Sequence, residues 1–238
     1  MTDGVNVLGF DTATAACSVC VTRADGQSFE HHPPPARMFE QPAHTTELLP
    51  TAIAMLTAAE LDWSDLDGVV VGVGPGAFTG LRIGLATARA IATARDLPLT
   101  PVSSLAALAA AVASPTLAIL DARRGELFFR EPSGDESCAP DAVAQPDDLL
   151  AIVARLATGD SPPLALGDGA VKLRAALEGA GLEVAPDDDP RHVVSARLLV
   201  EVAARLSPLP VDQVVPNYIR EPDAKASSRE RWLSGAVK

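Results

Sequence analysis

The first hundred residues alternate between short apolar runs and stretches whose apolar residues recur every three or four positions. Short apolar runs predict β-strands, whereas the three- and four-residue spacing predicts helices. The predicted strands are Val5–Asp11, Cys17–Arg23, Gln27–His32, Gly68–Val73 and Leu99–Val102. Asp25-Gly26 is typical of a two-residue hairpin turn, so the second and third strands should pair directly.

Apolar spacing predicts a helix from about His44 to Leu61, and this helix carries two apolar rows. One row is Leu49, Ile53 and Leu56, and the other is Leu48, Ala52, Met55 and Ala59. Pro50 should either start the main helix or kink it, because its ring does not fit a helix interior.

A glycine-rich segment, GVGPGAFTGLRIG at residues 72–84, joins the fourth strand to a helix that should extend to about Arg95. Thr79 is the expected N-cap of that helix, and Ser103 the expected cap of the next. The predicted structural turn consists of Gly74, Pro75, Gly76, Thr79 and Gly80. The resulting order of elements, β-β-β-α-β-α-β-α, is the ribonuclease H-like arrangement.

The second half repeats this order in abridged form. Strands are predicted at Leu117–Asp121, Glu126–Arg130 and Leu164–Leu166, and helices near 147–157 and 195–206. Two such halves predict an α/β protein of two tandem actin/hexokinase-type (ASKHA) lobes, the second abridged. The predicted division places an N-terminal lobe at 1–103 and a C-terminal lobe with a tail at 104–238.

The glycine-rich segment does not fit the known phosphate-binding loops. A P-loop requires a lysine after its last glycine, and no lysine lies between residues 72 and 171. A dinucleotide fingerprint requires glycine where this chain has Thr79, and Pro75 lacks a backbone N–H that a phosphate cradle would use.

Glycines continue into the predicted helix, where Gly80, Gly84, Ala88 and Ala92 are four residues apart. Glycine in a helix costs about 0.5–1 kcal/mol relative to alanine, so close approach of another backbone should compensate. The neighbour is either the protein's own sheet or a helix of another subunit, with Leu81, Arg82 and Leu85 bordering the ridge.

No catalytic or metal-binding constellation is recognisable. Asp11-Thr12-Ala13 resembles the D-x-G turn of actin-like ATPases, but Ala13 replaces the glycine that lets phosphate approach. His31, His32, His44 and His192 show neither H-x-x-x-H nor H-E-x-x-H spacing. The C-x-x-C pair, Cys17 and Cys20, lies in a predicted strand, where residues three apart face opposite sides.

Charge and hydropathy limit the partners further. The formal net charge is −12 at pH 7, which disfavours independent binding to nucleic acid. No segment approaches the roughly 20 apolar residues of a membrane span, and the N-terminus lacks a basic leader region. We therefore expect a cytoplasmic protein without membrane contact.

Several motifs together resemble the bacterial TsaB (YeaZ) family. They are GFDTATAACSVCV, HTTELLP, GVGPGAFTGLRIG, PVSSLAAL, LDARRGELFF and PNYIREP, in the order found in that family. The glycine motif is similar to the family's GPGSFTGLRIG, with Ala77 in place of serine. The resemblance covers most of residues 5–131 and returns at 216–222.

This resemblance implies a non-catalytic subunit of the machinery that makes N6-threonylcarbamoyladenosine in tRNA, next to the anticodon. It implies pairing with a TsaD-like catalytic subunit and a TsaE-like ATPase, homodimers through an overlapping surface, and tRNA contact only within the complex. ATP and metal are expected on the partners, with no cofactor here. The implied interface residues are His44, Glu47, Leu48, Leu81, Arg82, Gly84, Leu85 and Ala88. An actin-fold ATPase or kinase and a metallopeptidase-like enzyme remain the alternatives.

Overall fold

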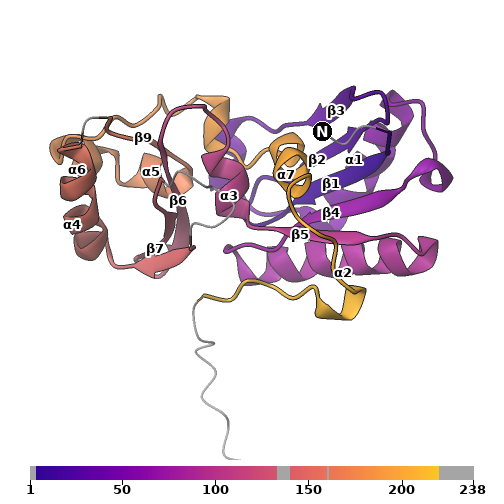
Figure 1. Cartoon of the computed structure of the whole chain (residues 1–238). Helices are drawn as coiled ribbons and strands as arrows, with labels where there is room; N and C mark the ends of the chain where they lie inside the picture. Colours follow the sequence, from indigo (N-terminus) through magenta and orange to yellow (C-terminus); the bar gives the residue numbers. More distant parts are fainter. Residues whose placement is uncertain (1–3, 133–139, 160, 220–238) are drawn as a thin grey trace, which may run out of the picture.

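The computed structural model describes residues 4–132, 140–159 and 161–219, which form two β-sheets with helices around them (Figure 1). The predicted mixed α/β class is confirmed. In the described residues no helix is long and apolar enough to cross a membrane.

The first sheet has five strands in the order β3-β2-β1-β4-β5. Its strands are β1 (Val7–Asp11), β2 (Ser18–Thr22), β3 (Ser28–His31), β4 (Gly68–Gly72) and β5 (Leu99–Val102). The first three pair antiparallel, and β4 and β5 add in parallel. The predicted β2–β3 hairpin is confirmed, but its loop has three residues, Ala24 to Gly26, because the Arg23 N–H donates to the Gln27 carbonyl and the Gly26 N–H to the Arg23 carbonyl. All residues of β1, β2 and β4 are buried, because helices cover both faces of the sheet.

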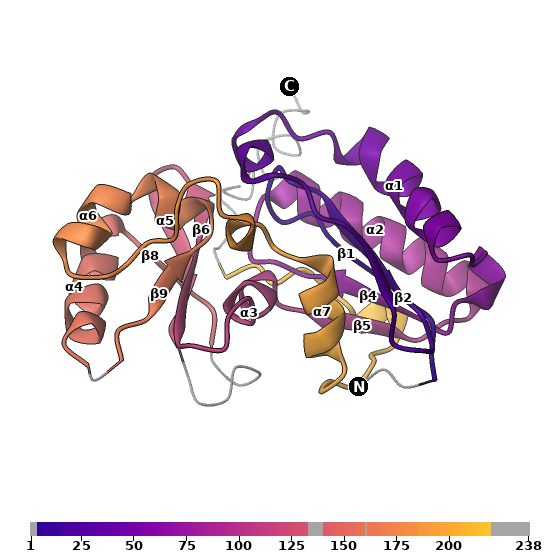
Figure 2. The same cartoon turned by 90° about the horizontal axis from the view of Figure 1, so that it is seen from above.

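Helices α1 (His44–Ala58) and α2 (Phe78–Arg95) pack on one face of this sheet, and α7 (Ala196–Ala203) packs on the other (Figure 2). Alternate residues of β1 therefore belong to different cores on the two faces of the sheet. Leu8 and Phe10 join the core under α1 and α2, whereas Val7 joins the core under α7. A short helix, η1 (Pro35–Phe39), connects β3 to α1.

The second sheet has four strands in the order β8-β7-β6-β9. They are β6 (Thr116–Arg123), β7 (Glu126–Arg130), β8 (Ala142–Ala144) and β9 (Leu164–Leu166). Helices α4 (Pro146–Ala157), α5 (Asp168–Lys172) and α6 (Arg174–Gly179) share a core with one face of this sheet. Helix α3 (Ser104–Ala109) packs on the other face and joins α7 in a single core between the two sheets.

The predicted division at residues 103 and 104 separates the strands of the two sheets, but the chain after residue 194 returns to the first sheet. Helix α7 packs against β1 and β2, and Leu209 forms an isolated bridge with Leu99 of β5. Asn217 then donates its backbone N–H to Val73 at the end of β4, 2.8 Å away. The first lobe is therefore completed by the C-terminal part of the chain.

The predicted Thr79 cap is wrong, the Ser103 cap is confirmed, and of the two alternatives for Pro50 the structure excludes the start of the helix. Helix α2 begins at Phe78 with Ala77 as its N-cap, so Thr79 already lies in the first turn and caps nothing. Pro50 lies inside α1, which begins six residues before it. Ser103 caps α3 as predicted, accepting the N–H of Ala106 at 3.1 Å.

Candidate functional site: the 11–14 turn and the α1–α2 face

In the turn after β1, the carboxylate of Asp11 is buried and forms its hydrogen bonds within the chain. Asp11 is 1% exposed, and its carboxylate accepts the N–H of Ala13 at 2.8 Å and the hydroxyl of Ser104 at 2.5 Å. Burial raises the pKa of Asp11 to about 6, although both hydrogen bonds oppose the shift. The polar groups of this turn are thus satisfied within the chain.

The glycine-rich segment packs against this turn, and this packing explains its composition. A methyl group added at Gly76 would lie 2.4 Å from the Ala13 carbonyl oxygen, and one at Gly80 would lie 2.2 Å from the Thr12 carbonyl oxygen. At Gly84 the added methyl would lie 2.3 Å from the Thr12 hydroxyl. That hydroxyl donates to the Gly80 carbonyl at 2.9 Å, and the Ala77 N–H donates to the Ala13 carbonyl at 2.7 Å. Because the glycines have no side chains, α2 and the turn before it lie directly against the 11–14 turn.

A second buried aspartate lies in the loop after β9, which pairs in parallel with β6 as β4 pairs with β1. Asp168, in the Gly167-Asp168-Gly169 segment, accepts the N–H of Asp121 at 2.9 Å and is 4% exposed. Burial raises its pKa to about 6. A methyl group added at Gly167 would lie 2.1 Å from the Ile119 carbonyl oxygen, so this glycine serves close packing on β6.

Six of the eight predicted interface residues are buried within the chain: His44, Leu48, Leu81, Gly84, Leu85 and Ala88. The prediction that their side chains form a partner surface is corrected, because Gly80 and Gly84 face Thr12 of the same chain. Of the two alternatives for the ridge, contact within the chain is confirmed.

The other two interface residues, Glu47 and Arg82, reach the surface. Glu47 accepts from Arg37 at 2.7 Å. Arg82 lies 3.8 Å from the ring centre of Phe78 and donates to the Tyr218 hydroxyl at 3.3 Å. The rings of Phe78 and Tyr218 are stacked with centres 5.5 Å apart, so the C-terminal segment completes this cluster at the start of α2.

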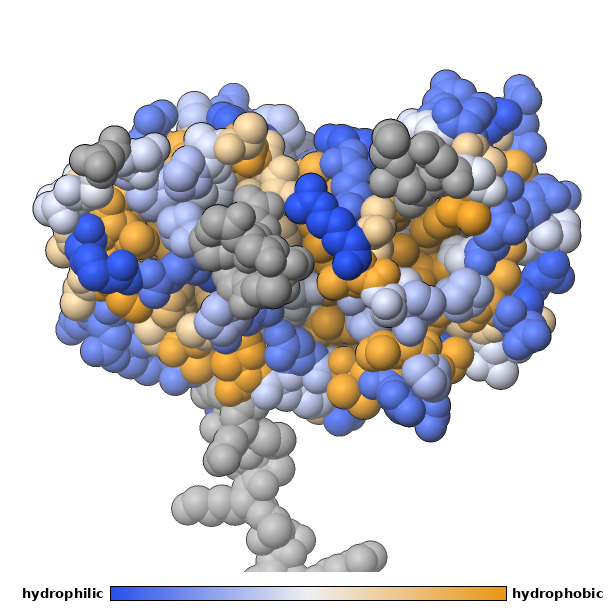
Figure 3. Space-filling model, viewed as in Figure 1, coloured by the Kyte–Doolittle hydropathy of each residue, from blue (hydrophilic) through white to orange (hydrophobic). Residues whose placement is uncertain are grey.

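The exposed side of α1 and α2 is apolar, and the interface prediction did not include it. A groove of about 540 Å³ lies there, and we call it the α1–α2 groove; its lining is Leu49, Trp63, Ala86, Thr87, Ala90, Ile91, Ala94 and Arg95. Leu49 is 47% exposed and Ile53, one turn further along α1, is 52% exposed. Apolar residues also reach the surface along the edge of the first lobe where α2 runs (Figure 3).

A sequence signal for this groove was present. Helix α1 carries two predicted apolar rows. In the row of Leu48, Ala52, Met55 and Ala59 all but Met55 are buried, whereas in the other row only Leu56 is buried and Leu49 and Ile53 are exposed. A surface helix needs one apolar face, so a second apolar row indicates a second contact.

The described residues contain no group of three histidine, cysteine, aspartate or glutamate side chains placed to hold a metal ion. Cys17 and Cys20 are both buried free cysteines, and burial raises the pKa of each thiol to about 12. Both thiols are therefore protonated at neutral pH.

Comparison with known proteins identifies relatives over most of the chain. Residues 39–163 match the family model described as TsaD, tRNA N6-adenosine threonylcarbamoyltransferase. An uncharacterized Mycobacterium leprae protein is 35% identical over 92% of this chain, which spans only 56% of that protein. The tRNA threonylcarbamoyladenosine biosynthesis protein TsaB of Escherichia coli is 36% identical over 56% of this chain and 57% of its own length. TsaB of Bacillus subtilis is 28% identical over 96% of this chain and 98% of its own length.

Solved structures agree with these relatives. YeaZ from Pseudomonas aeruginosa superimposes with a TM-score of 0.71 at 26% identity, covering 90% of this chain and 99% of that one.

Proposed function

This chain belongs to the TsaB (YeaZ) family, and from that premise we propose that it is the non-catalytic subunit of the complex that installs N6-threonylcarbamoyladenosine on tRNA. In this proposal it activates a TsaD-like catalytic subunit by binding it. A TsaE-like ATPase joins the complex, and the nucleotide and metal are held by the partners. The two sheets are then two lobes of the actin type, the second abridged.

The α1–α2 groove is the observation that carries the proposal. Soluble monomers rarely leave a large contiguous apolar patch in water, and such patches mark contacts with other proteins. Leu49 and Ile53 present branched side chains at its edge, about half exposed, while alanines of α2 keep its floor shallow. A helix of a partner fits such a floor, because small side chains let two helix backbones approach closely. Homodimers are expected to use the same groove and to compete with the TsaD-like subunit.

Asp11 and Asp168 are buried and hydrogen-bonded within the chain, which supports a role in protein binding rather than in catalysis. In actin-type enzymes the corresponding turns must admit phosphate. Here the N–H groups of Ala13 and Asp121 are already bonded to Asp11 and Asp168, and Ala13 and Ile119 lie against glycines with no room for a methyl group.

Leu49→Asp tests the proposal, because a carboxylate in the groove opposes burial against a partner helix. We expect affinity for the TsaD-like subunit of the same host to fall by about 30-fold or more, the size of an interface hot spot. Formation of threonylcarbamoyladenosine by the reconstituted complex should fall with it. The matched control is Ala154→Asp, at an exposed position of α4.

Titration calorimetry and nucleoside analysis of tRNA provide the two measurements, with circular dichroism to confirm that each variant is folded. A folded Leu49→Asp protein with wild-type affinity would exclude the groove as the contact surface. Modified tRNA made by the TsaD-like and TsaE-like proteins alone would exclude the activating role.

A further inference from the structure

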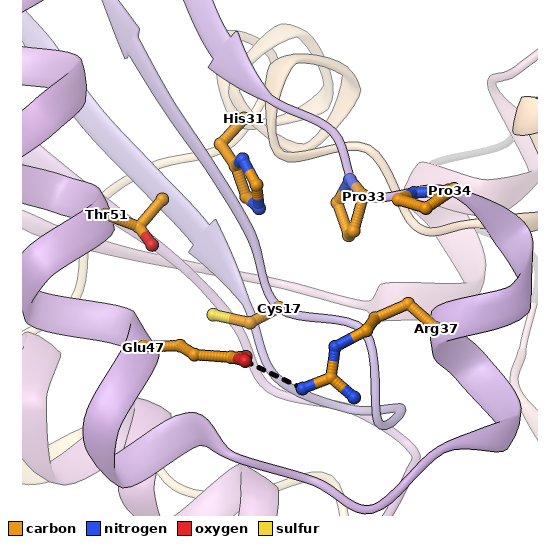
Figure 4. Close-up of a pocket in the computed structure, with 7 residues that line it drawn as sticks. All are labelled: Cys17, His31, Pro33, Pro34, Arg37, Glu47 and Thr51. Atoms are coloured by element: carbon orange, nitrogen blue, oxygen red, sulfur yellow. Dashed lines mark hydrogen bonds and ion pairs between the residues drawn. The ribbon is translucent and has the colours of Figure 1, made fainter.

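A second, polar cavity lies beside α1, away from the α1–α2 groove (Figure 4). Its volume is about 290 Å³, and its lining is Cys17, His31, Pro33, Pro34, Arg37, Glu47 and Thr51. Strand β3 with the prolines after it forms one wall, and the first half of α1 forms the opposite wall. The Arg37–Glu47 ion pair spans the cavity between η1 and α1.

The charges around this cavity favour a cation. Arg37 donates to three acceptors: the carboxylates of Glu40 and Glu47, at 3.1 and 2.7 Å, and the Gln41 carbonyl, at 3.0 Å. Glu47 lines the cavity, whereas Glu40 lies outside the lining and its side chain is 60% exposed, so the excess of negative charge comes from the surroundings of the cavity. The net charge of −12 on the whole chain adds to the attraction of cations.

Three hydrogen-bonding groups of the lining have no partner among the described residues. Glu47 uses one carboxylate oxygen for Arg37, and its second oxygen accepts no hydrogen bond. The Thr51 hydroxyl, one turn further along α1, and the His31 ring also make no hydrogen bond within the described chain. In its neutral form the imidazole presents one acceptor nitrogen, so the cavity offers three acceptors.

We propose that this cavity binds a small molecule carrying a primary ammonium group. An ammonium has three donors and no acceptor, which matches Glu47, Thr51 and His31. Its hydrogen bond to the carboxylate is charge-assisted and therefore supplies much of the affinity.

The other lining residues and the volume of the cavity limit the size and polarity of the rest of the ligand. Pro33 and Pro34 offer apolar, rigid surfaces suited to methylene groups. Burial raises the pKa of the Cys17 thiol to about 12, so this side chain is a neutral contact. Ligand pockets commonly measure roughly 300–1,000 Å³, so this cavity suits a short alkyl amine and is too small for a nucleotide.

The experiment uses the full chain and 1,4-diaminobutane as the probe, with binding followed by NMR chemical shifts. We expect saturable shifts for residues of the cavity. Glu47→Gln should weaken binding by roughly 10-fold or more, because it removes the charge but keeps the shape. Thr51→Val should weaken it several-fold without disturbing the Arg37 pair.

Butyrate and 1-butanol are the comparison probes, since they are aliphatic molecules of similar length that carry no ammonium group. Neither should bind with comparable affinity. The Leu49→Asp variant should bind the diamine like the wild type, which separates this site from the proposed subunit contact.

Three results would overturn the proposal: no saturable shifts up to tens of millimolar diamine, wild-type affinity in a folded Thr51→Val protein, or equal binding of butyrate. If Glu47→Gln does not fold, the diamine affinities of Thr51→Val and His31→Ala test the proposal, and wild-type affinity in either folded variant would overturn it.

Discussion

Asp11 shows how a buried carboxylate can be held entirely by groups of its own chain. Its carboxylate accepts one N–H from its own turn and one hydroxyl from α3. Gly72 makes room for it, because a methyl group there would lie 1.9 Å from the Asp11 carboxylate. The side chain thus links the first sheet to α3, and its burial sets its protonation.

Replacing Asp11 with Asn should change the pH dependence of stability. The folded pKa of about 6 exceeds the ordinary 3.8, so the folded state binds more protons between those values. The Asp11 contribution to the free energy of unfolding therefore falls as pH rises from about 4 to 6, by about 3 kcal/mol in all. Asn removes the charge: its amide oxygen can accept the Ala13 N–H, and its NH2 group can donate to the Ser104 hydroxyl oxygen. Its stability relative to wild type should rise by roughly that amount over this range.

Urea denaturation at several pH values between 4 and 7.5 measures this difference. Asp188→Asn, at an exposed position, is the control and should differ from wild type by the same amount at every pH. A similarly constant difference for Asp11→Asn would show that the carboxyl ionises normally in the folded protein.

At the scale of elements, α2 owes its position to the glycines along one side. Gly80 and Gly84 allow its first two turns to rest directly on Thr12, and Ala88 and Ala92 continue this buried row into the core. The cost of glycine in a helix is offset by this contact and by the Thr12 hydrogen bond. The other side of α2 remains free to line the α1–α2 groove.

Gly84→Ala should loosen this packing and lower stability by about 1–3 kcal/mol, since the added methyl meets the Thr12 hydroxyl at 2.3 Å. Thermal unfolding followed by circular dichroism measures the effect. Gly179→Ala is a matched control in α6, where an added methyl meets nothing within 4 Å. It should be neutral or slightly stabilising. Equal melting temperatures for the two variants would contradict close contact between α2 and the 11–14 turn.

On the scale of the whole molecule, acidity and architecture point to a protein that acts through partners. The chain has 19 basic and 31 acidic residues. Many of the arginines in the described part are paired with carboxylates, as Arg130 is with Asp141 at 2.7 Å. A single core joins the two sheets through α3 and α7, so partners meet a prearranged surface.

The isolated chain should bind tRNA only weakly. At a net charge of −12 it repels a polyanion, so we expect affinity no tighter than the ~10⁻⁴–10⁻⁶ M of non-specific contacts at physiological salt. The assembled complex should bind better because its partners supply basic surface. Filter binding over a salt series compares the two. Tight, salt-resistant binding by the lone chain would mean that it recognises RNA directly, contrary to the proposed role.

Sequence patterns located all strands of the first sheet and three of the four strands of the second, usually to within a residue or two, because strand formation follows local runs of apolar residues. The short strand β8 was missed. Local chemistry also identified the Asp25-Gly26 hairpin and the Ser103 cap. The Thr79 cap was wrong, since packing against β4 extends α2 to Phe78, before its preferred starting residue. Pro50 does not start α1, which begins at His44 as predicted. Partner residues were the weakest prediction, because family motifs do not distinguish a buried contact from an exposed one.

The sequence by itself determined the α/β class, the order of elements, the net charge and the family. Each of these depends on composition or on residues close together in the chain. Only the tertiary structure decided which apolar row of α1 is buried, what the glycines of α2 face and where α7 packs. These depend on contacts between residues far apart in the chain, such as Thr12 with Gly84 and β1 with α7. Two apolar rows on one helix are chemically alike, and only the position of the sheet distinguishes the core from the free surface.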